Sequence, residues 1–328
     1  MSFLFCSIFT AFLIDYFCGE FKQHHPLVYF GQWADRWQQR FNVAGQRQLL
    51  LGFVAWAIAV MPIVLAFYVI GLWLQYSFIL DFIFSSVVLY IAIGRQSLMQ
   101  HAQAIIKPLQ DVETLKRQGS AKVSDAENAL NDARHHVSMI VSRDCSSLSE
   151  EEIIVAGTES VLENGADAIF AAIFWFCIAG VPGVVLYRLS NTLDAMWGYK
   201  NQQYKLFGRF SARFDDLLNY IPARLTALSY CLLAPLVHGN IRLAYECWQN
   251  QGGTWKSPNA GPVMSAGAGA LQVSLGGTAS YNGQVQYRPT LGVDIDQGRP
   301  LNAATLLAAC KLVNSTVILW LLLIFIFA

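Results

Sequence analysis

A stretch of 27 residues without a charge places the strongest constraint on this chain. It runs from Gln48 to Leu74 and reads QLLLGFVAWAIAVMPIVLAFYVIGLWL. A helix needs about 20 predominantly apolar residues to cross the hydrocarbon core of a bilayer. A second apolar run, from Leu312 to Ala328, nearly reaches that length. The sequence therefore predicts an all-α integral membrane protein.

Composition agrees with this prediction and excludes other classes. Only 13% of the residues are charged, against about 25% in soluble domains. The 22 basic and 22 acidic residues cancel, so no electrostatic footprint indicates a nucleic-acid partner. The seven cysteines show no C-x-x-C spacing, which favours buried apolar residues over disulfides or a zinc site.

The basic residues predict how the chain is oriented. Apolar segments fall at about 3–18, 48–74, 78–94, 168–187, 225–237 and 312–328. Segment 19–47 carries several basic residues, whereas the short link between the second and third apolar segments carries none. By the positive-inside rule, segment 19–47 is cytoplasmic and the short link is external.

Two apolar segments are expected to enter the membrane without crossing it. Segment 168–187 contains AGVPG at 179–183, a cluster that breaks helices. A full crossing there would place six basic residues of 188–224 outside. A re-entrant hairpin avoids both problems, and segment 225–237 is short and contains Pro235. We therefore expect about four full transmembrane helices and two partial or re-entrant segments.

One polytopic membrane domain, 1–328, is expected to carry three cytoplasmic regions. Segments 95–167 and 188–224 are predicted to be helical loops that form the active site, and 238–311 a Gly/Ala-rich loop. Ser124 with Glu127 and Ser149 with Glu152 have the spacing of capping boxes, which predicts two helix starts within the first loop.

The second of these helices carries three carboxylates at i, i+4 and i+8. Glu159, Glu163 and Asp167 would form one stripe, with neighbours about 5–6 Å apart. Such a stripe is either a solvated acidic face or a site for a hard cation such as Mg²⁺. Because the helix runs directly into an apolar segment, where unpaired charge is costly, the cation site is favoured.

A second group of charges lies in RFSARFDDLLNYIPAR, from Arg209 to Arg224. On a helix, Arg209 and Arg213 share a face with Asp216, and Asp215 and Asn219 share a neighbouring face. One interpretation is an intrahelical ladder of salt bridges. The other is an anion clamp beside a metal ligand, because the arginine fork binds phosphate oxygens in pairs.

Taken together, these segments resemble the CobD/CbiB family, the adenosylcobinamide-phosphate synthases. The resemblance covers nearly the whole chain. It is carried by LIDYFCGE, HPLVYFG, SRD, ESVLEN, NTLDAMWGYK, FGRFSARFDDLLNYIPARLTAL, and SPNAG followed by LGG. Two departures are visible: Cys145 stands where the family usually has threonine, and Phe21 where a proline is common.

The resemblance implies an inner-membrane enzyme whose active site faces the cytoplasm. Such an enzyme joins adenosylcobyric acid to an aminoalkyl phosphate, such as 1-amino-2-propanol O-2-phosphate, with ATP and Mg²⁺. The expected partners are the corrinoid, the aminoalkyl phosphate, the lipid bilayer and neighbouring cobalamin-pathway enzymes, but no nucleic acid.

Site residues are expected in three roles. The catalytic candidates are Glu159, Glu163, Asp215 and Asp216. The metal candidates are Glu159, Glu163, Asp167 and Asp194. The candidates for binding substrate and phosphate are His25, Arg134, Arg143, Asn164, Asn191, Lys200, Arg209, Arg213, Arg224, Ser257 and Asn259.

Three other functions stay open at this point. An AmpE-like sensory or regulatory membrane protein would lack much of this polar set. A transporter would use acidic residues such as Asp15 and Asp81, which lie within or beside apolar segments. A metal-dependent prenyltransferase would show D-x-x-x-D repeats and more full-length spans.

Overall fold

The computed structural model describes residues 2–19, 25–43, 48–118, 123–198, 204–281 and 284–328. These residues form two compact units, each built from separate stretches of the chain. Unit 1 comprises Met1–Gln96, Asp167–Pro222 and Leu321–Ala328. Unit 2 comprises Ser97–Ala166 and Ala223–Trp320.

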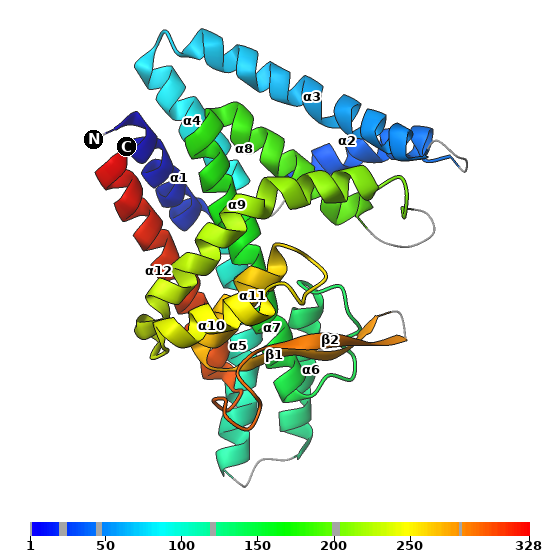
Figure 1. Cartoon of the computed structure of the whole chain (residues 1–328), viewed down its shortest axis with the longest axis vertical. Helices are drawn as coiled ribbons and strands as arrows, with labels where there is room; N and C mark the ends of the chain where they lie inside the picture. The colour runs from blue at the N-terminus through cyan, green and yellow to red at the C-terminus, as the bar shows by residue number, and fades with distance from the viewer. Residues whose placement is uncertain (1, 20–24, 44–47, 119–122, 199–203, 282–283) are drawn as a thin grey trace. The chain divides into compact units, whose positions relative to one another are not determined.

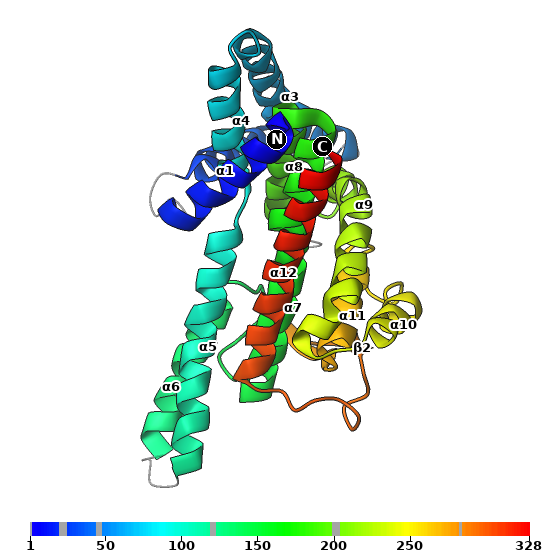
Figure 2. The same ribbon diagram turned by 90° about the vertical axis from the view of Figure 1, so that its left-hand side faces the viewer.

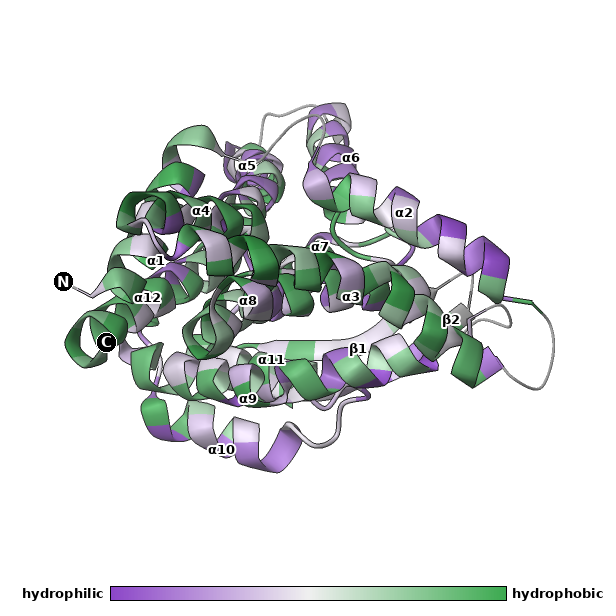
Figure 3. Ribbon diagram, turned by 90° about the horizontal axis from the view of Figure 1, so that it is seen from above, coloured by the Kyte–Doolittle hydropathy of each residue, from purple (hydrophilic) through white to green (hydrophobic). Residues whose placement is uncertain are grey.

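Unit 1 is a bundle of mostly apolar helices. Its main helices are α1 (Phe3–Cys18), α2 (Pro26–Phe41), α3 (Gln48–Leu74), α4 (Phe78–Ala92) and α8 (Ala171–Trp197). Helix α8 packs against α2, α3 and α4, and α1 packs against α4. Figure 3 shows hydrophobic residues along most of α3 and α4, as expected for helices surrounded by lipid.

Helix α8 reverses direction in the middle, at the predicted break. Ala179 and Gly180 leave the helical conformation, and Gly180 adopts φ +60° and ψ −148°, which is almost exclusively a glycine conformation. The Tyr187 hydroxyl donates a 2.7 Å hydrogen bond to the main-chain oxygen of Asp167. An unbroken helix would place these two residues about 30 Å apart. The chain therefore folds back as a helical hairpin, and the bend can be followed in Figures 1 and 2.

The predicted fold class is confirmed. Within the described residues, five helical stretches are long and apolar enough to cross a membrane: Gln48–Leu74, Phe78–Gln118, Glu150–Trp197, Arg209–Val237 and Ala303–Phe327. Helix α1, with 16 residues, is shorter than these five. The protein is a nearly all-α integral membrane protein, and its described β-structure is one two-stranded hairpin.

Unit 2 contains the helices α5 (Arg95–Gln118, from Ser97), α6 (Val123–Ser138), α7 (Glu150–Gly165), α10 (Ile241–Gln251) and α11 (Ala260–Leu271). The antiparallel strands β1 (Ser274–Tyr281) and β2 (Gln284–Gly292) follow α11. Helices α9 (Arg209–Leu233) and α12 (Ala303–Phe327) contribute residues to both units. The polar colouring of α6 and α10 in Figure 3 contrasts with the apolar helices of unit 1.

Helix α11 holds unit 2 together, because its small residues allow close packing. All twelve of its residues are buried, and it contacts α7, α10 and both strands. A Cβ atom on Gly267 would lie 2.6 Å from Cδ1 of Leu162 on α7, so a larger residue there would require the Leu162 side chain to move. The region 238–311, expected to be a Gly/Ala-rich loop, is thus largely folded into α10, α11 and the hairpin.

Candidate functional site

Helix α7 begins at the second predicted capping box, which the structure confirms. The Ser149 hydroxyl accepts a hydrogen bond from the Glu152 amide, and the Glu152 carboxylate accepts one from the Ser149 amide. This box fixes where α7 starts and therefore which residues face the interior of unit 2. Glu159 and Glu163 lie one turn apart on this helix. The third residue of the expected stripe, Asp167, falls in unit 1, in the π-helical turn η1 (Ala166–Phe170).

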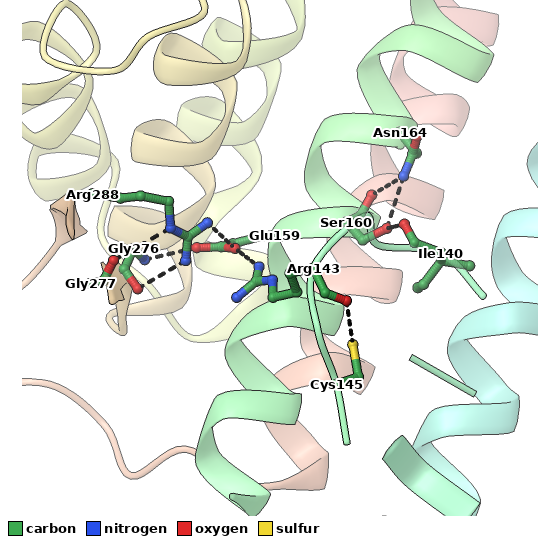
Figure 4. Close-up of polar contacts among 9 residues, drawn as sticks. All are labelled: Ile140, Arg143, Cys145, Glu159, Ser160, Asn164, Gly276, Gly277 and Arg288. Carbon is green, nitrogen blue, oxygen red and sulfur yellow. Dashed lines mark hydrogen bonds and ion pairs between the residues drawn. The ribbon is translucent and has the colours of Figure 1, made fainter. Parts of the chain in front are cut away.

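The Glu159 carboxylate is the centre of a buried polar cluster (Figure 4). Its Oε2 atom accepts hydrogen bonds from Arg143 and, at 2.9 Å, from Nη1 of Arg288. Its Oε1 atom accepts a 2.8 Å hydrogen bond from the amide of Gly276. The side chains of Glu159, Arg143 and Arg288 are only 5%, 6% and 11% exposed. We call Arg143, Glu159, Gly276 and Arg288 the Glu159 cluster.

Three segments meet in the Glu159 cluster. Arg143 comes from the loop before α7, Glu159 from α7 itself, and Gly276 and Arg288 from the two strands. Arg288 also donates to the main-chain oxygens of Gly276 and Gly277, next to the β-bulge between Leu275 and Gly277. Removing one partner of such a buried ion pair leaves an uncompensated charge and is strongly destabilising. The cluster therefore fixes the hairpin to α7.

The donor set around Glu159 does not fit a metal site. Both carboxylate oxygens are occupied by N–H donors, and the charges beside them are positive. In the described part of the chain, no three His, Cys, Asp or Glu side chains come together in a way that could hold a metal ion. The repulsion between Glu159 and Glu163 is thus offset by two arginines, where the sequence suggested a cation.

Glu163 lies one turn beyond Glu159 and differs from it in its contacts. Among the described residues, no hydrogen-bond or ion-pair partner is found for its carboxylate. Arg143 and Arg288 are close enough to interact with it electrostatically. Because the described structure gives this carboxylate no fixed partner, it is available to accept a proton or to contact a ligand.

Two groups in the loop before α7 have shifted acidities. Burial raises the pKa of the Cys145 thiol, an effect that the nearby Arg143 opposes. The thiol donates to the main-chain oxygen of Arg143, at 3.3 Å. Hydrogen bonds from the amide and hydroxyl of Ser146 lower the pKa of Asp144. Cys145 is therefore a packing residue that supports the position of Arg143.

Unit 1 contains a second buried polar cluster. Asp215 accepts hydrogen bonds from the side-chain amides of Asn191, at 3.3 Å, and Asn219, at 3.0 Å. The Tyr187 hydroxyl lies 3.0 Å from Oδ1 of Asn219. Asp215 is a buried residue of a largely apolar unit. Tyr187, Asn191, Asp215 and Asn219, which we call the Asp215 cluster, join the second arm of α8 to α9.

Three expected binding residues come together in unit 2. Arg224 donates to Oδ1 of Asn259 and to the main-chain oxygen of Pro258, both at 2.9 Å. The Ser257 hydroxyl accepts hydrogen bonds from the amides of Asn259 and Ala260, at the start of α11. These contacts hold the Arg224 guanidinium against the SPNAG segment, as an anion-binding role would require.

Other expected site residues have local contacts. His25 caps α2 by accepting from the Leu27 amide, and Asn164 donates to Ser160. Arg134 binds Glu127, Asn131 and the main-chain oxygen of Leu148. Arg209 and Arg213 are exposed on α9, Asp216 is half-buried there, and Asp194 lies near the end of α8. Lys200 lies outside the described residues.

Sequence reasoning missed several residues of these clusters. Arg288 lies 129 positions from Glu159, so no helical or strand spacing could connect the two. Tyr187 and Gly276 were also missed, although both lie inside or beside segments that were considered. The i, i+4 spacing did place Asn219 on the face of Asp215, but Asn219 was not counted among the site residues, and the structure shows that the two side chains are hydrogen-bonded.

These features define a class: an integral membrane protein with a folded unit that contains a buried, arginine-bound carboxylate. The family model for the CobD/Cbib protein matches residues 8–313. The chain therefore belongs to the CobD/CbiB family.

Individual relatives agree with this assignment. The chain is 47% identical over 320 residues to a cobalamin biosynthesis protein CobD of Stutzerimonas stutzeri, which covers 97% of this chain and 96% of that protein. It is 44% identical over 328 residues to a protein of the same name from Chromobacterium violaceum, and the match covers 94% of this chain and 92% of that protein. A third protein of this name, from Clostridium tetani, is 32% identical over 291 residues, and the match covers 87% of this chain and 86% of that protein. No solved structure matches this chain.

Proposed function

We propose that this chain is a membrane-bound, ATP-dependent ligase of cobalamin biosynthesis. It would join a free propionate of adenosylcobyric acid to the amine of an aminoalkyl phosphate, such as 1-amino-2-propanol O-2-phosphate. The product is adenosylcobinamide phosphate. The observation that carries the proposal is the family match over residues 8–313, which includes the Glu159 cluster, Glu163 and the Asp215 cluster.

The reaction needs two bond-forming steps. A carboxylate accepts an amine poorly, so its oxygen first takes the terminal phosphoryl group of ATP, which gives an acyl phosphate and ADP. The amine nitrogen then attacks the acyl carbon, the C–N bond forms, and the C–O bond to phosphate breaks. Inorganic phosphate leaves, and the amine gives up a proton to a base. Fixed cationic groups and a positioned base speed these steps.

The described residues suggest how these roles are divided. Glu163 has no fixed partner among the described residues and is our candidate for the base that keeps the amine neutral. Glu159 is our candidate for a positioning residue, because its carboxylate is occupied by Arg143, Arg288 and Gly276. Mg²⁺ is proposed to arrive with the phosphates of ATP as part of the substrate, since the donors around Glu159 do not suit a resident ion.

The proposed location is the inner membrane, with the polar segments on the cytoplasmic side. The basic residues of 19–47 support this orientation. The reversal within α8 supports it as well, because both ends of a hairpin lie on the same side of a membrane. Residues 188–224 would then return to the side from which the hairpin started.

Turnover by the purified protein is the direct test. The protein in lipid nanodiscs is incubated with adenosylcobyric acid, ATP, Mg²⁺ and 1-amino-2-propanol O-2-phosphate. Mass spectrometry should detect adenosylcobinamide phosphate, together with one ADP and one inorganic phosphate per product. In cells, deletion of the gene should make adenosylcobyric acid accumulate, and added cobinamide should restore cobalamin-dependent growth. Absence of product together with failure of this rescue would contradict the proposal.

A further inference from the structure

A second feature of unit 2, a pocket beside α10 and α11, has no role in the sites described so far. Its volume is about 370 Å³, within the range of small-molecule sites. The pocket is formed by the end of α10, the 252–258 segment, the first turn of α11 and Arg224. Helices α10 and α11 themselves are labelled in Figure 1. We call it the α10–α11 pocket.

The lining of this pocket combines two kinds of side chain. Trp248 and Trp255 provide two indole rings, and Arg224 and Lys256 provide two positive charges. The described lining contains no Asp or Glu. An anion with an aromatic part is therefore the ligand that the lining fits best, because phosphates bind the cations and a flat ring stacks on indole.

The cationic groups are held in place by neighbouring residues. Asn259 and the main-chain oxygen of Pro258 fix the Arg224 guanidinium at 2.9 Å. Lys256 donates to Oε1 of Gln286 on β2, at 3.2 Å. An ammonium group has three N–H donors, so this bond leaves capacity for a ligand.

Trp255 connects the pocket to the Glu159 cluster. The guanidinium of Arg288 lies over its ring, 5.3 Å from the ring centroid. The same guanidinium binds Glu159. A ligand in the α10–α11 pocket would therefore lie one aromatic ring away from a residue that fixes the buried carboxylate.

From these contacts we infer that the α10–α11 pocket binds a purine nucleotide, with the base against the indoles and the phosphates at Arg224 and Lys256. The inference rests on the proposed function, since ligation driven by ATP requires a nucleotide site and the sequence contains no P-loop motif. An aminoalkyl phosphate has no aromatic part and would leave both indoles unused.

Photolabelling locates the site. The wild-type protein in nanodiscs is labelled with 2-azido-ATP, digested and mapped by mass spectrometry. The label is expected within 248–262, and excess ATP should prevent it. A label confined to other segments would overturn the inference. Protection of 248–262 by 1-amino-2-propanol O-2-phosphate but not by ATP would also overturn the inference.

Binding measurements separate the two parts of the site. Equilibrium dialysis with ATP should show that Trp248→Leu and Trp255→Leu each raise the Kd about tenfold or more, as expected for loss of base stacking. Trp73→Leu, a matched control on an exposed residue of α3, should leave the Kd unchanged. Lys256→Gln should weaken ATP binding but leave adenosine binding unchanged. If both single variants, Trp248→Leu and Lys256→Gln, bind ATP with wild-type affinity, the nucleotide site is refuted.

These measurements stay informative if the proposed function fails. Suppose that the wild-type protein makes no product but binds ATP, and that the pocket variants lose this binding. This outcome would support the nucleotide site and contradict the ligase. Normal turnover, with an unchanged KM for ATP in Trp248→Leu and Lys256→Gln, would support the ligase and contradict the nucleotide site. In the described structure, Trp248 takes no part in the hydrogen bonds of the Glu159 cluster, so Trp248→Leu should leave that cluster intact.

Discussion

The Tyr187 hydroxyl binds the main-chain oxygen of Asp167, 20 positions earlier in the chain, at 2.7 Å. This bond joins the second arm of α8 to the π-helical turn η1, which precedes the first arm. Because these two segments meet there, the apolar residues between them can enter a membrane only as a hairpin. A linear hydropathy count would treat the same residues as one span and would place every later segment on the opposite side of the membrane.

The hairpin predicts a labelling pattern in intact cells. Single cysteines are introduced at Asp132 and Lys205, both exposed, in a background without the seven native cysteines. Both should resist a membrane-impermeant thiol reagent until the cells are opened. A cysteine at Tyr76, in the short link after α3, is the control and should react in intact cells. Reaction at Lys205 in intact cells would show that α8 crosses the membrane.

Gly180 should be essential to the hairpin for conformational reasons alone. A Cβ atom added there would meet nothing within 4 Å, but φ is +60°. A non-glycine residue in this region costs about 1–3 kcal/mol. Gly180→Ala should therefore lower the thermal midpoint of the protein in detergent. Gly71→Ala, within α3 and with its nearest neighbour 4.0 Å away, should not lower it, and equal midpoints for the two variants would contradict the strain argument.

Glu159→Gln should destabilise unit 2. The substitution leaves Arg143 and Arg288 buried without a counter-charge, which costs about 3–5 kcal/mol in buried pairs. The expected result is faster limited proteolysis in the β1–β2 hairpin. Glu246→Gln is the matched control, because it breaks an exposed i, i+4 pair with Arg242, and such pairs contribute little. Equal protease resistance of the two variants would show that the Glu159 cluster is not needed for folding.

Glu163→Gln should act on turnover and leave folding intact. Glutamine keeps the size and helix propensity of glutamate and removes its charge. If Glu163 is the base, the loss of one positioned group should lower kcat by about 30- to 1000-fold. Limited proteolysis should match the wild type, in contrast to Glu159→Gln. A variant with near wild-type kcat would contradict the assignment of Glu163 as base.

Cys145→Thr should be nearly neutral. A threonine hydroxyl can make the contact that the thiol makes with the main-chain oxygen of Arg143. Kinetics of the variant should stay within a few-fold of the wild type. In the native protein, burial raises the pKa of the Cys145 thiol, so less thiolate is present at neutral pH and alkylation should be slow. Unfolded protein is the control and should react fast; rapid alkylation of the native thiol would contradict a packing role.

Local signals in the sequence were sufficient for much of the fold. Run length predicted the membrane helices, the AGVPG cluster predicted the reversal in α8, and the Ser149 capping box predicted the start of α7. All three depend on residues within one or two turns of each other. The Ser124 box was less accurate, because α6 already begins at Val123.

Contacts across long distances in the chain could not be predicted. The i, i+4 pattern identified Glu159 and Glu163 but not what offsets their charges, because Arg288 is 129 positions away. The hairpin that carries Arg288 was hidden as well, since its glycines resembled a loop. Helical spacing also assumed an unbroken α-helix through Asp167, and the π-helical turn η1 interrupts that register.

The distance between Glu159 and Arg288 also sets an order of events during synthesis. A ribosome adds about 5–20 residues per second, so Arg288 is made roughly 6–26 seconds after Glu159, which lies 129 positions earlier. Arg143 is available from the start, but the second guanidinium is not. The nascent chain must therefore hold a partly compensated carboxylate next to an apolar segment while α8 is being inserted. Any chain that terminates before Arg288 would never complete this unit, and the cell's quality-control proteases would meet it in that unfinished form.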